Sequence, residues 1–259
     1  MLSKLFGLFP DGILKNKLLC FYYNYFKKSG FRISYKKRYF KLNFNDNSIK
    51  VFENPNVCGN AEFTFKRYLK HYEIKKGDVV IDAGASIGVF SLCTAKMVGS
   101  NGIVIAFEPD NSNYEILQKN VKLNNLDNII TLKKGLWSRN ENLDFYNDNS
   151  ETSHLIFDDV IDKSKIVKIP VVKLDDELKK LGIKKVNFIK MDIEGAEVES
   201  IKGCKNILKE NKVNLAIASY HVIDGEETRI SLQKIFPKLG YNNCKTFFTD
   251  HPITYASKN

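Results

Sequence analysis

The sequence is poor in the residues that build disulfide frameworks and zinc sites. Its 259 residues include five cysteines, an odd number, and no two of them form a Cys-x-x-Cys pair. Wide spacing and an odd count argue against a disulfide scaffold and against a structural zinc site. We therefore expect reduced, mostly buried thiols at Cys20, Cys58, Cys93, Cys204 and Cys244.

Long apolar runs are also missing. No stretch approaches the roughly eighteen consecutive apolar residues that a membrane-spanning helix needs, and no small-residue cleavage site follows a short apolar run after Met1. These absences predict a cytoplasmic protein. With 43% hydrophobic residues the chain can still bury a full-sized hydrophobic core, so we do not expect it to be mainly disordered.

Acidic residues are scarce in one part of the chain only. Residues 1–76 carry sixteen Lys and Arg against five acids, a net charge of +11, whereas residues 77–259 carry twenty-four against twenty-five, a net charge of −1. Between Asp11 and Asp46 there is no acid at all. This change in net charge predicts two parts: a basic N-terminal extension over residues 1–76 and a nearly neutral domain, the body, over residues 77–259. We expect the extension to consist of helices and a β-hairpin that cap the body.

The basic extension has three interpretations. Over residues 1–41 its Lys and Arg alternate with Phe, Tyr and Leu, a mixture that suits peripheral contact with an anionic membrane surface. The same composition can track a nucleic-acid backbone, although the body lacks the basic excess that a nucleic-acid enzyme would need. In the third interpretation the segment is a solvated hairpin whose aromatic side chains pack on the body.

In the body, apolar runs alternate with segments of helical periodicity, the pattern of a parallel sheet covered on both faces. We expect an irregular polar stretch over residues 140–164 and a closing hairpin over residues 241–258. Strands are expected over residues 78–81, 102–109, 128–137, 165–174, 184–195 and 212–221, and helices over residues 87–97, 111–123, 198–208 and 230–236.

The stretch "DVVIDAGASIGVFSL" predicts a ligand site at the first turn of the body. A strand that ends on Asp82 and turns through small residues into a helix brings backbone N–H groups close to a ligand. Glu108 follows at the end of the next strand, where an acid accepts hydrogen bonds from ribose hydroxyls. Ser86 replaces the middle glycine of a dinucleotide fingerprint, and Asp82 would repel a pyrophosphate. The site therefore suits S-adenosylmethionine, whose sulfonium and ammonium are cationic.

A second block, "KMDIEG", predicts the chemistry. Lys190, Asp192 and Glu194 alternate, so in extended backbone they point to one face at the carboxyl end of a strand. Methyl transfer to an alcohol benefits from a base or a metal. Asp192 and Glu194 are the candidates, with His221 at the end of the neighbouring strand as a third; the same three groups could hold Mg²⁺. In the alternative interpretation Glu194 only favours a helix start, Lys190 pairs with Asp192, and His221 is structural.

The amino-acid sequences of four segments resemble those of the FkbM-family methyltransferases. These segments are "VIDAGASIGVFSL", "VIAFEPDNSNYEILQKNVKLNN", "VVKLDDEL" and "VNFIKMDIEGAEVESIKG". The resemblance implies an α/β class I methyltransferase fold, Rossmann-like, with a mostly parallel seven-stranded sheet in the order 3-2-1-4-5-7-6. It also implies S-adenosylmethionine as methyl donor. The cofactor-binding residues expected on these grounds are Asp82, Gly84, Ala85, Ser86, Gly88, Glu108, Pro109, Leu136 and Asp192; Ser86 stands where the family commonly has Asn.

Three functions are compatible with these residues. The first is an O-methyltransferase that acts on a sugar hydroxyl of a glycan, glycolipid or glycosylated metabolite, as the resemblance implies. A nucleic-acid methyltransferase is less favoured, because no D/N-P-P-Y/F loop follows the fourth strand. A catalytically inactive nucleoside-binding module is opposed by the intact Asp82, Glu108, Asp192 and Glu194.

Overall fold

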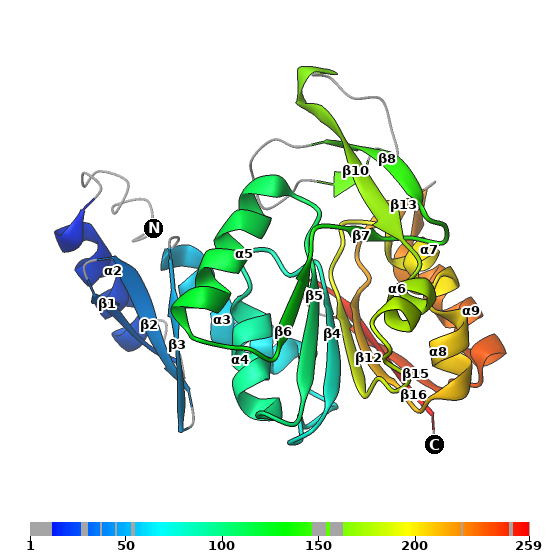
Figure 1. The fold of residues 1–259 in the computed structure, drawn as a ribbon, viewed down its shortest axis with the longest axis horizontal. Helices are drawn as coiled ribbons and strands as arrows, with labels where there is room; N and C mark the ends of the chain where they lie inside the picture. Colours follow the sequence, from blue (N-terminus) through cyan, green and yellow to red (C-terminus); the bar gives the residue numbers. More distant parts are fainter. Residues whose placement is uncertain are drawn as a thin grey trace.

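The computed structural model describes residues 12–26, 31–36, 38–44, 46–52, 55–146, 154–155, 163–223, 225–248 and 251–258. Its centre is a seven-stranded sheet in the order β15-β16-β12-β11-β4-β5-β6 (Figure 1). Numbered along the body, this is the predicted order 3-2-1-4-5-7-6, and β16 runs opposite to the other six strands of that sheet. The strands are β4 (Val79–Ala83), β5 (Ile103–Phe107), β6 (Ile129–Leu132), β11 (Phe188–Met191), β12 (Asn214–Ala218), β15 (Asn243–Phe247) and β16 (Ile253–Ser257).

Both faces of this sheet are covered, as the continuous apolar runs predict. Successive side chains of a strand point to opposite faces, so Val80 and Phe188 join one buried cluster while Ile81 and Ile189 join the other. One face packs against α3 (Pro55–Tyr68) and α4 (Val89–Val98), with α5 (Asn111–Leu123) beside them, and the other against α6 (Leu174–Lys180), α7 (Glu197–Lys202), α8 (Lys205–Glu210) and α9 (Thr228–Ile235). In the described part of the chain no helix is long and apolar enough to cross a bilayer.

Two expected elements are divided in the structure. The strand expected over residues 128–137 separates into β6 and β7 (Gly135–Leu136), which belong to different sheets. The helix expected over residues 198–208 separates into α7 and α8 at Gly203. A Cβ atom at Gly203 would lie 2.0 Å from the backbone oxygen of Trp137, so the chain passes too close there for a larger residue.

The stretch expected to be irregular, residues 140–164, contains part of a second sheet. Strand β8 (Glu141–Tyr146) pairs with β10 (Ile166–Val172), and the order β7-β10-β8-β9 includes the short β9 (His154–Leu155). Every second residue of β8 faces solvent and is polar, so its sequence lacks the continuous apolar run of a central strand. The small sheet stands above the carboxyl edge of the central one, at the top of Figure 1.

The N-terminal extension forms a helix and a three-stranded antiparallel sheet: α2 (Ile13–Tyr25), β1 (Arg32–Lys36), β2 (Tyr39–Phe44) and β3 (Asn47–Val51). The β-hairpin expected in this extension is thus part of a sheet of three strands. Residues 1–11 and 27–30 lie outside the described part of the chain. The inner face of this sheet is buried in one cluster with Val80 and Phe90 of the body, and the division at residue 76 stays a prediction.

Asparagine side chains seal both edges of the three-stranded sheet. Asn24 of α2 donates to the oxygen of Ile33 at 2.8 Å and accepts from its N–H at 2.9 Å. On the other edge, Asn124 of α5 makes the same pair of bonds with Lys50, and Asn120 accepts from the N–H of Phe52 at 2.7 Å. These bonds occupy backbone groups of the edge strands that could otherwise pair with another strand. They also attach the three-stranded sheet to α2 on one side and to α5 on the other.

Replacing Asn120 with alanine should destabilise the protein. Asn120 is fully buried and also donates to the oxygen of Ile87 at 2.8 Å, so its removal leaves two buried backbone groups without partners. We expect Asn120→Ala to lower the free energy of unfolding by about 2–4 kcal/mol in urea denaturation, while exposed Lys119→Ala on the same helix changes it by less than about 0.5 kcal/mol. Equal midpoints for the two variants would contradict this role.

Candidate functional site

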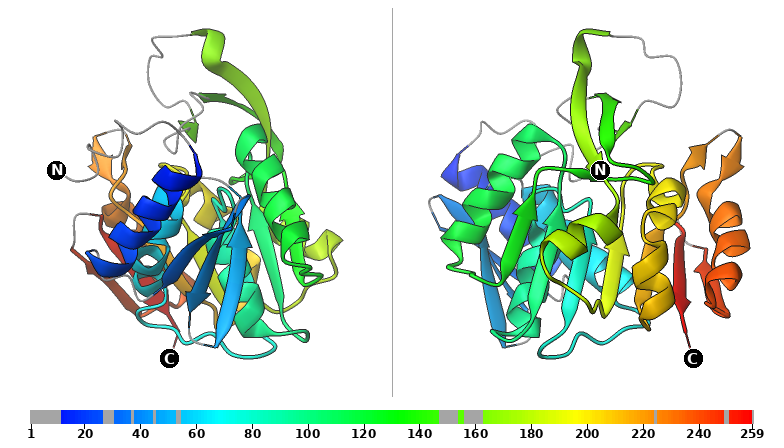
Figure 2. Two further views of the ribbon diagram at one scale, coloured as in Figure 1. Left: turned by 90° about the vertical axis from the view of Figure 1, so that its left-hand side faces the viewer. Right: turned by 45° about the vertical axis from the view of Figure 1, so that its right-hand side comes forward.

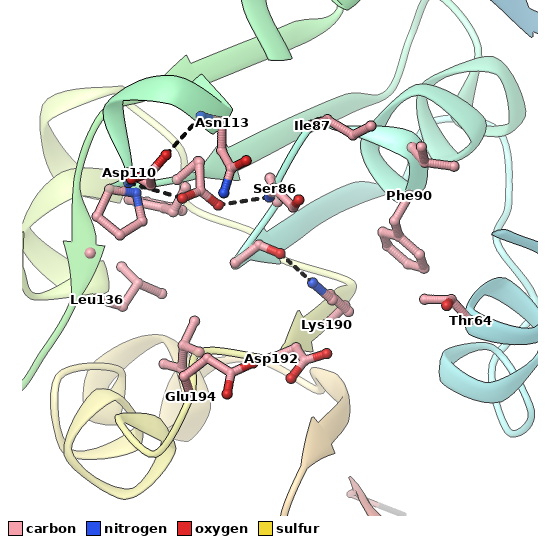
Figure 3. Close-up of a pocket in the computed structure, with 18 of the residues that line it drawn as sticks. Thr64, Ser86, Ile87, Phe90, Asp110, Asn113, Leu136, Lys190, Asp192 and Glu194 are labelled. Atoms are coloured by element: carbon pink, nitrogen blue, oxygen red, sulfur yellow. Dashed lines mark hydrogen bonds between the residues drawn. The ribbon is translucent and has the colours of Figure 1, made fainter. Parts of the chain in front are cut away.

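A cavity of about 610 Å³ lies at the carboxyl ends of β4, β5 and β11. Helix α3 and the small sheet contribute to its walls through residues such as Phe65 and Phe145. Ligands of open parallel sheets bind at this edge, and the volume lies within the roughly 300–1,000 Å³ of small-molecule sites. Figure 3 shows Ser86, Asp110 and Asn113 along one side of the hollow and Asp192 and Glu194 along the other.

The first wall is the turn from β4 to α4. The N–H groups of Gly84 and Ala85 donate to the oxygen of Phe107 at 3.0 and 2.9 Å. Gly84 has a φ of +76°, and a Cβ atom there would lie 1.8 Å from the backbone oxygen of Asp192, so only glycine fits. Gly84, Ala85 and Ser86 line the cavity, as expected.

Gly88 lies elsewhere than expected, since it is not among the lining residues. It is the N-cap of α4 with a φ of +90°, and a Cβ atom would lie 2.4 Å from Cδ1 of Leu117. Its small size therefore serves the packing of α4 against α5.

Glu108 is buried at the end of β5 and lines the cavity. Its carboxylate accepts from the N–H of Ser86 at 2.7 Å and from the N–H of Asp110 at 2.9 Å. Burial raises the pKa of Glu108 to about 7, and the two backbone donors limit the rise. Pro109 and Leu136 lie at the same end of the cavity.

Asp82 departs from its expected place. It is fully buried and does not line the cavity. Lys190, its register partner on β11, places Nζ 3.0 Å from Asp82 Oδ1, and Ser91 Oγ donates to Oδ2 at 2.6 Å. Lys190 thus pairs with Asp82 rather than with Asp192, and the direct cofactor contact expected of Asp82 is replaced by a supporting position below the turn.

Asp192 lies just after β11 and lines the cavity. The Tyr68 hydroxyl donates to Oδ2 at 2.7 Å, whereas Oδ1 is buried and has no hydrogen-bond partner among the described residues. Burial and the charge of Asp192 raise the pKa of Tyr68 well above its usual value. Tyr68 therefore stays a donor to Oδ2, and Oδ1 makes no hydrogen bond within the described residues.

The loop after Asp192 brings two more acids to His221. Nε2 of His221 lies 3.3 Å from Glu194 Oε2, and Nδ1 lies 3.0 Å from Oε1 of the buried Glu197. Burial alone would lower the pKa of His221, but the two carboxylates outweigh it and raise the pKa to about 10. His221 is therefore a cation at neutral pH. Glu194 lines the cavity, whereas His221 does not.

Several lining residues have no signal in the sequence. Arg67 comes from α3, which the sequence predicts only as a capping helix. Arg67 Nε is buried without a hydrogen-bond partner in the part of the chain that the structure describes, and its guanidinium lies 5.3 Å from the Phe63 ring centre. His251 also lines the cavity, with its ring 5.0 Å from that of Tyr220.

The chain is similar to proteins of one family over most of its length. The family model described as the methyltransferase FkbM domain matches residues 82–248. The 31-O-demethyl-FK506 methyltransferase FkbM of Streptomyces tacrolimicus is 26% identical over 63% of this chain and 73% of its own. The hexuronic acid methyltransferase AglP of Haloferax volcanii is 28% identical over 58% of each chain.

A solved structure supports the fold. The crystal structure of methyltransferase FkbM from Methylobacillus flagellatus has a TM-score of 0.52 and 22% identity over 72% of this chain. The match covers 45% of that solved chain, so this chain spans less than half of its length.

The pKa of Glu108 predicts how nucleoside binding depends on pH. Because that pKa is about 7, the carboxylate is mostly charged at pH 8 and mostly protonated at pH 6. Protonation turns one acceptor oxygen into a donor while Ser86 and Asp110 still donate to the group. Affinity for S-adenosylhomocysteine, measured by isothermal titration, should rise about tenfold from pH 6 to pH 8. Glu108→Gln should remove this dependence; a wild-type affinity that falls with pH would contradict the assignment.

Proposed function

Because the chain belongs to the FkbM methyltransferase family and is an S-adenosylmethionine-dependent methyltransferase, we propose that it methylates a hydroxyl oxygen of a sugar in a glycan, glycolipid or glycosylated metabolite. The observation that carries this proposal is the position of Asp192 in the cavity wall, where Tyr68 holds one of its carboxylate oxygens. A hexuronic acid methyltransferase and a demethyl-FK506 O-methyltransferase among the relatives support it.

The residues at the β5 end fit the nucleoside of the methyl donor. Glu108, at the end of the second strand, is our candidate for the ribose hydroxyls, and the apolar Leu136 and Pro109 are candidates for the adenine. Gly84, Ala85 and Ser86 provide a close-fitting wall without bulky side chains. When bound, S-adenosylmethionine supplies an electrophilic methyl group on a sulfonium.

Asp192 is our candidate for the general base. The Asp192 carboxylate would take the proton of the acceptor hydroxyl as that oxygen accepts the methyl group that bound S-adenosylmethionine would supply. Tyr68 holds Oδ2, which fixes the direction of the free oxygen. His221 lies between two carboxylates and carries a proton already, so it positions the loop of Glu194 and Glu197 rather than acting as a base.

Mg²⁺ is a poor fit for the same groups. One ligand atom from each of Asp192, Glu194 and His221 lies within 4.8 Å of the others. Mg²⁺ prefers oxygen ligands and octahedral geometry, whereas here one of three donors is an imidazole already paired with two carboxylates. The proposed methyl transfer therefore uses no metal ion.

Arg67 indicates an acidic acceptor. Both lysine side chains that line the cavity have acidic partners: Lys134 pairs with Glu177, and Lys190 pairs with Asp82. No ion pair engages Arg67 among the described residues, and its Nε lacks a partner. A guanidinium binds a carboxylate or a phosphate in a planar, bidentate geometry, so a sugar that bears such a group fits this side of the cavity.

Removing the base should abolish turnover without loss of cofactor binding. Asp192→Asn keeps the size of the side chain but cannot accept the proton, and general-base catalysis contributes about 10²–10⁴-fold. We expect that loss in kcat for S-adenosylhomocysteine release, with the thermal midpoint within a few degrees of wild type. Activity in EDTA should equal activity with added Mg²⁺. Full activity of Asp192→Asn, or a requirement for Mg²⁺, would refute this mechanism.

The role of Arg67 can be tested with matched acceptors. Glucuronides and the corresponding glucosides differ in one carboxylate, and wild type should methylate the acidic member at least about tenfold faster, as expected for a charged hydrogen-bonded pair. Arg67→Gln should lose this preference and keep its affinity for S-adenosylhomocysteine. If the neutral glucosides are preferred by both proteins, Arg67 has another role.

A further inference from the structure

Helix α2 exposes a row of large apolar side chains. Leu14, Phe21, Tyr25 and Phe26 are 66%, 53%, 63% and 64% exposed. Leu14, Phe21 and Tyr25 follow helical spacing and lie opposite the side of α2 that buries Leu19 and Tyr23. Contiguous exposed apolar surface usually marks an interaction site, and this one has no role in the methyl transfer described above.

The outer face of the neighbouring sheet is basic. Arg32, Lys36, Lys41 and Lys50 alternate with the buried residues of β1, β2 and β3, so their side chains share the solvent face. None of the three strands contains an acid. Lys41 and Lys50 are direct cross-strand partners, an arrangement that destabilises a sheet. The positive charge of this face is therefore unbalanced within the described extension.

The apolar row and the basic face lie on one side of the molecule. Asn24 joins α2 to the edge of β1 through both of its amide atoms. The left view of Figure 2 faces this side, where α2 and the strands β1–β3 lie side by side at the front. We call this surface, formed by the exposed side of α2 and the outer face of β1–β3, the docking face.

We propose that the docking face binds the surface of a bilayer that contains anionic lipid. Its aromatic and aliphatic side chains would enter the headgroup region while its Lys and Arg approach the lipid phosphates, the division found in interfacial helices. Charge decides against a second copy of the chain, because two copies would bring two basic faces together. Aliphatic Leu14 adds nothing to the stacking that nucleic acids use. This inference goes beyond methyl transfer and does not depend on the acceptor.

The test is sedimentation of the full-length protein with sucrose-loaded vesicles of phosphatidylcholine and phosphatidylserine in a 3:1 ratio. Wild type should bind these vesicles and not pure phosphatidylcholine. Two double variants remove one component each: Phe21→Ser with Tyr25→Ser, and Arg32→Glu with Lys36→Glu. Each should lower the partition coefficient by about tenfold or more, with unchanged circular dichroism and unchanged affinity for S-adenosylhomocysteine.

Matched controls change the same chemistry elsewhere. Phe248 is also exposed, but on the body, and Phe248→Ser should leave vesicle binding unchanged. Lys205→Glu with Lys238→Glu alters the net charge as much as the Arg32 and Lys36 pair does, at exposed positions of the body, and should have at most a twofold effect. The proposal is overturned if wild type does not bind the anionic vesicles, or if the control charge pair lowers binding equally. It is also overturned if the apolar variants only dissociate a dimer in sedimentation equilibrium.

Discussion

The buried pair between Asp82 and Lys190 holds the carboxyl edge of the sheet together. The two side chains are register partners on adjacent parallel strands, and neither has appreciable contact with solvent. The Lys190 ammonium also donates to the oxygens of Ala83 at 3.2 Å and Gly84 at 2.6 Å. One cation therefore joins the end of β4, the first residue of the turn and β11. A buried charge without its partner is costly, so this contact fixes the geometry on which the cavity depends.

The acidic side chains at the carboxyl edge of the sheet are all carboxylates, and their surroundings give them different roles. Asp82 is neutralised by an ammonium, and Glu108 is occupied by two backbone N–H groups and desolvated. Asp192 has one oxygen held by Tyr68 and one without a described partner. Glu194 and Glu197 share a histidine cation. Of these carboxylates, Asp192 combines a position in the cavity wall with a hydrogen bond from Tyr68 that fixes its orientation, which is what a base for a hydroxyl requires.

The sequence predicts most of the sheet because its apolar runs and turns are local signals. The helix expected over residues 111–123 is confirmed, and so is the strand order, which the family resemblance implied. The strand β8 was missed because its alternating polar residues resemble a loop. The need for glycine at position 203 comes from a backbone oxygen distant in sequence, that of Trp137. Likewise, the alternation of Lys190, Asp192 and Glu194 predicts a shared edge but not that Lys190 selects Asp82, since strand register is a tertiary property. Arg67 reaches the cavity, and Tyr68 reaches the carboxylate of Asp192, only through the packing of α3.

In the proposed mechanism, the methyl donor binds between Glu108 and Glu194, and Asp192 faces its reacting methyl group. The most direct test is a crystal structure of the protein with S-adenosylhomocysteine. The account predicts that the ribose contacts Glu108 and that the sulfur faces Oδ1 of Asp192 with space for one hydroxyl group between them. A sulfur atom directed away from Asp192, or a ribose held elsewhere than at Glu108, would contradict it.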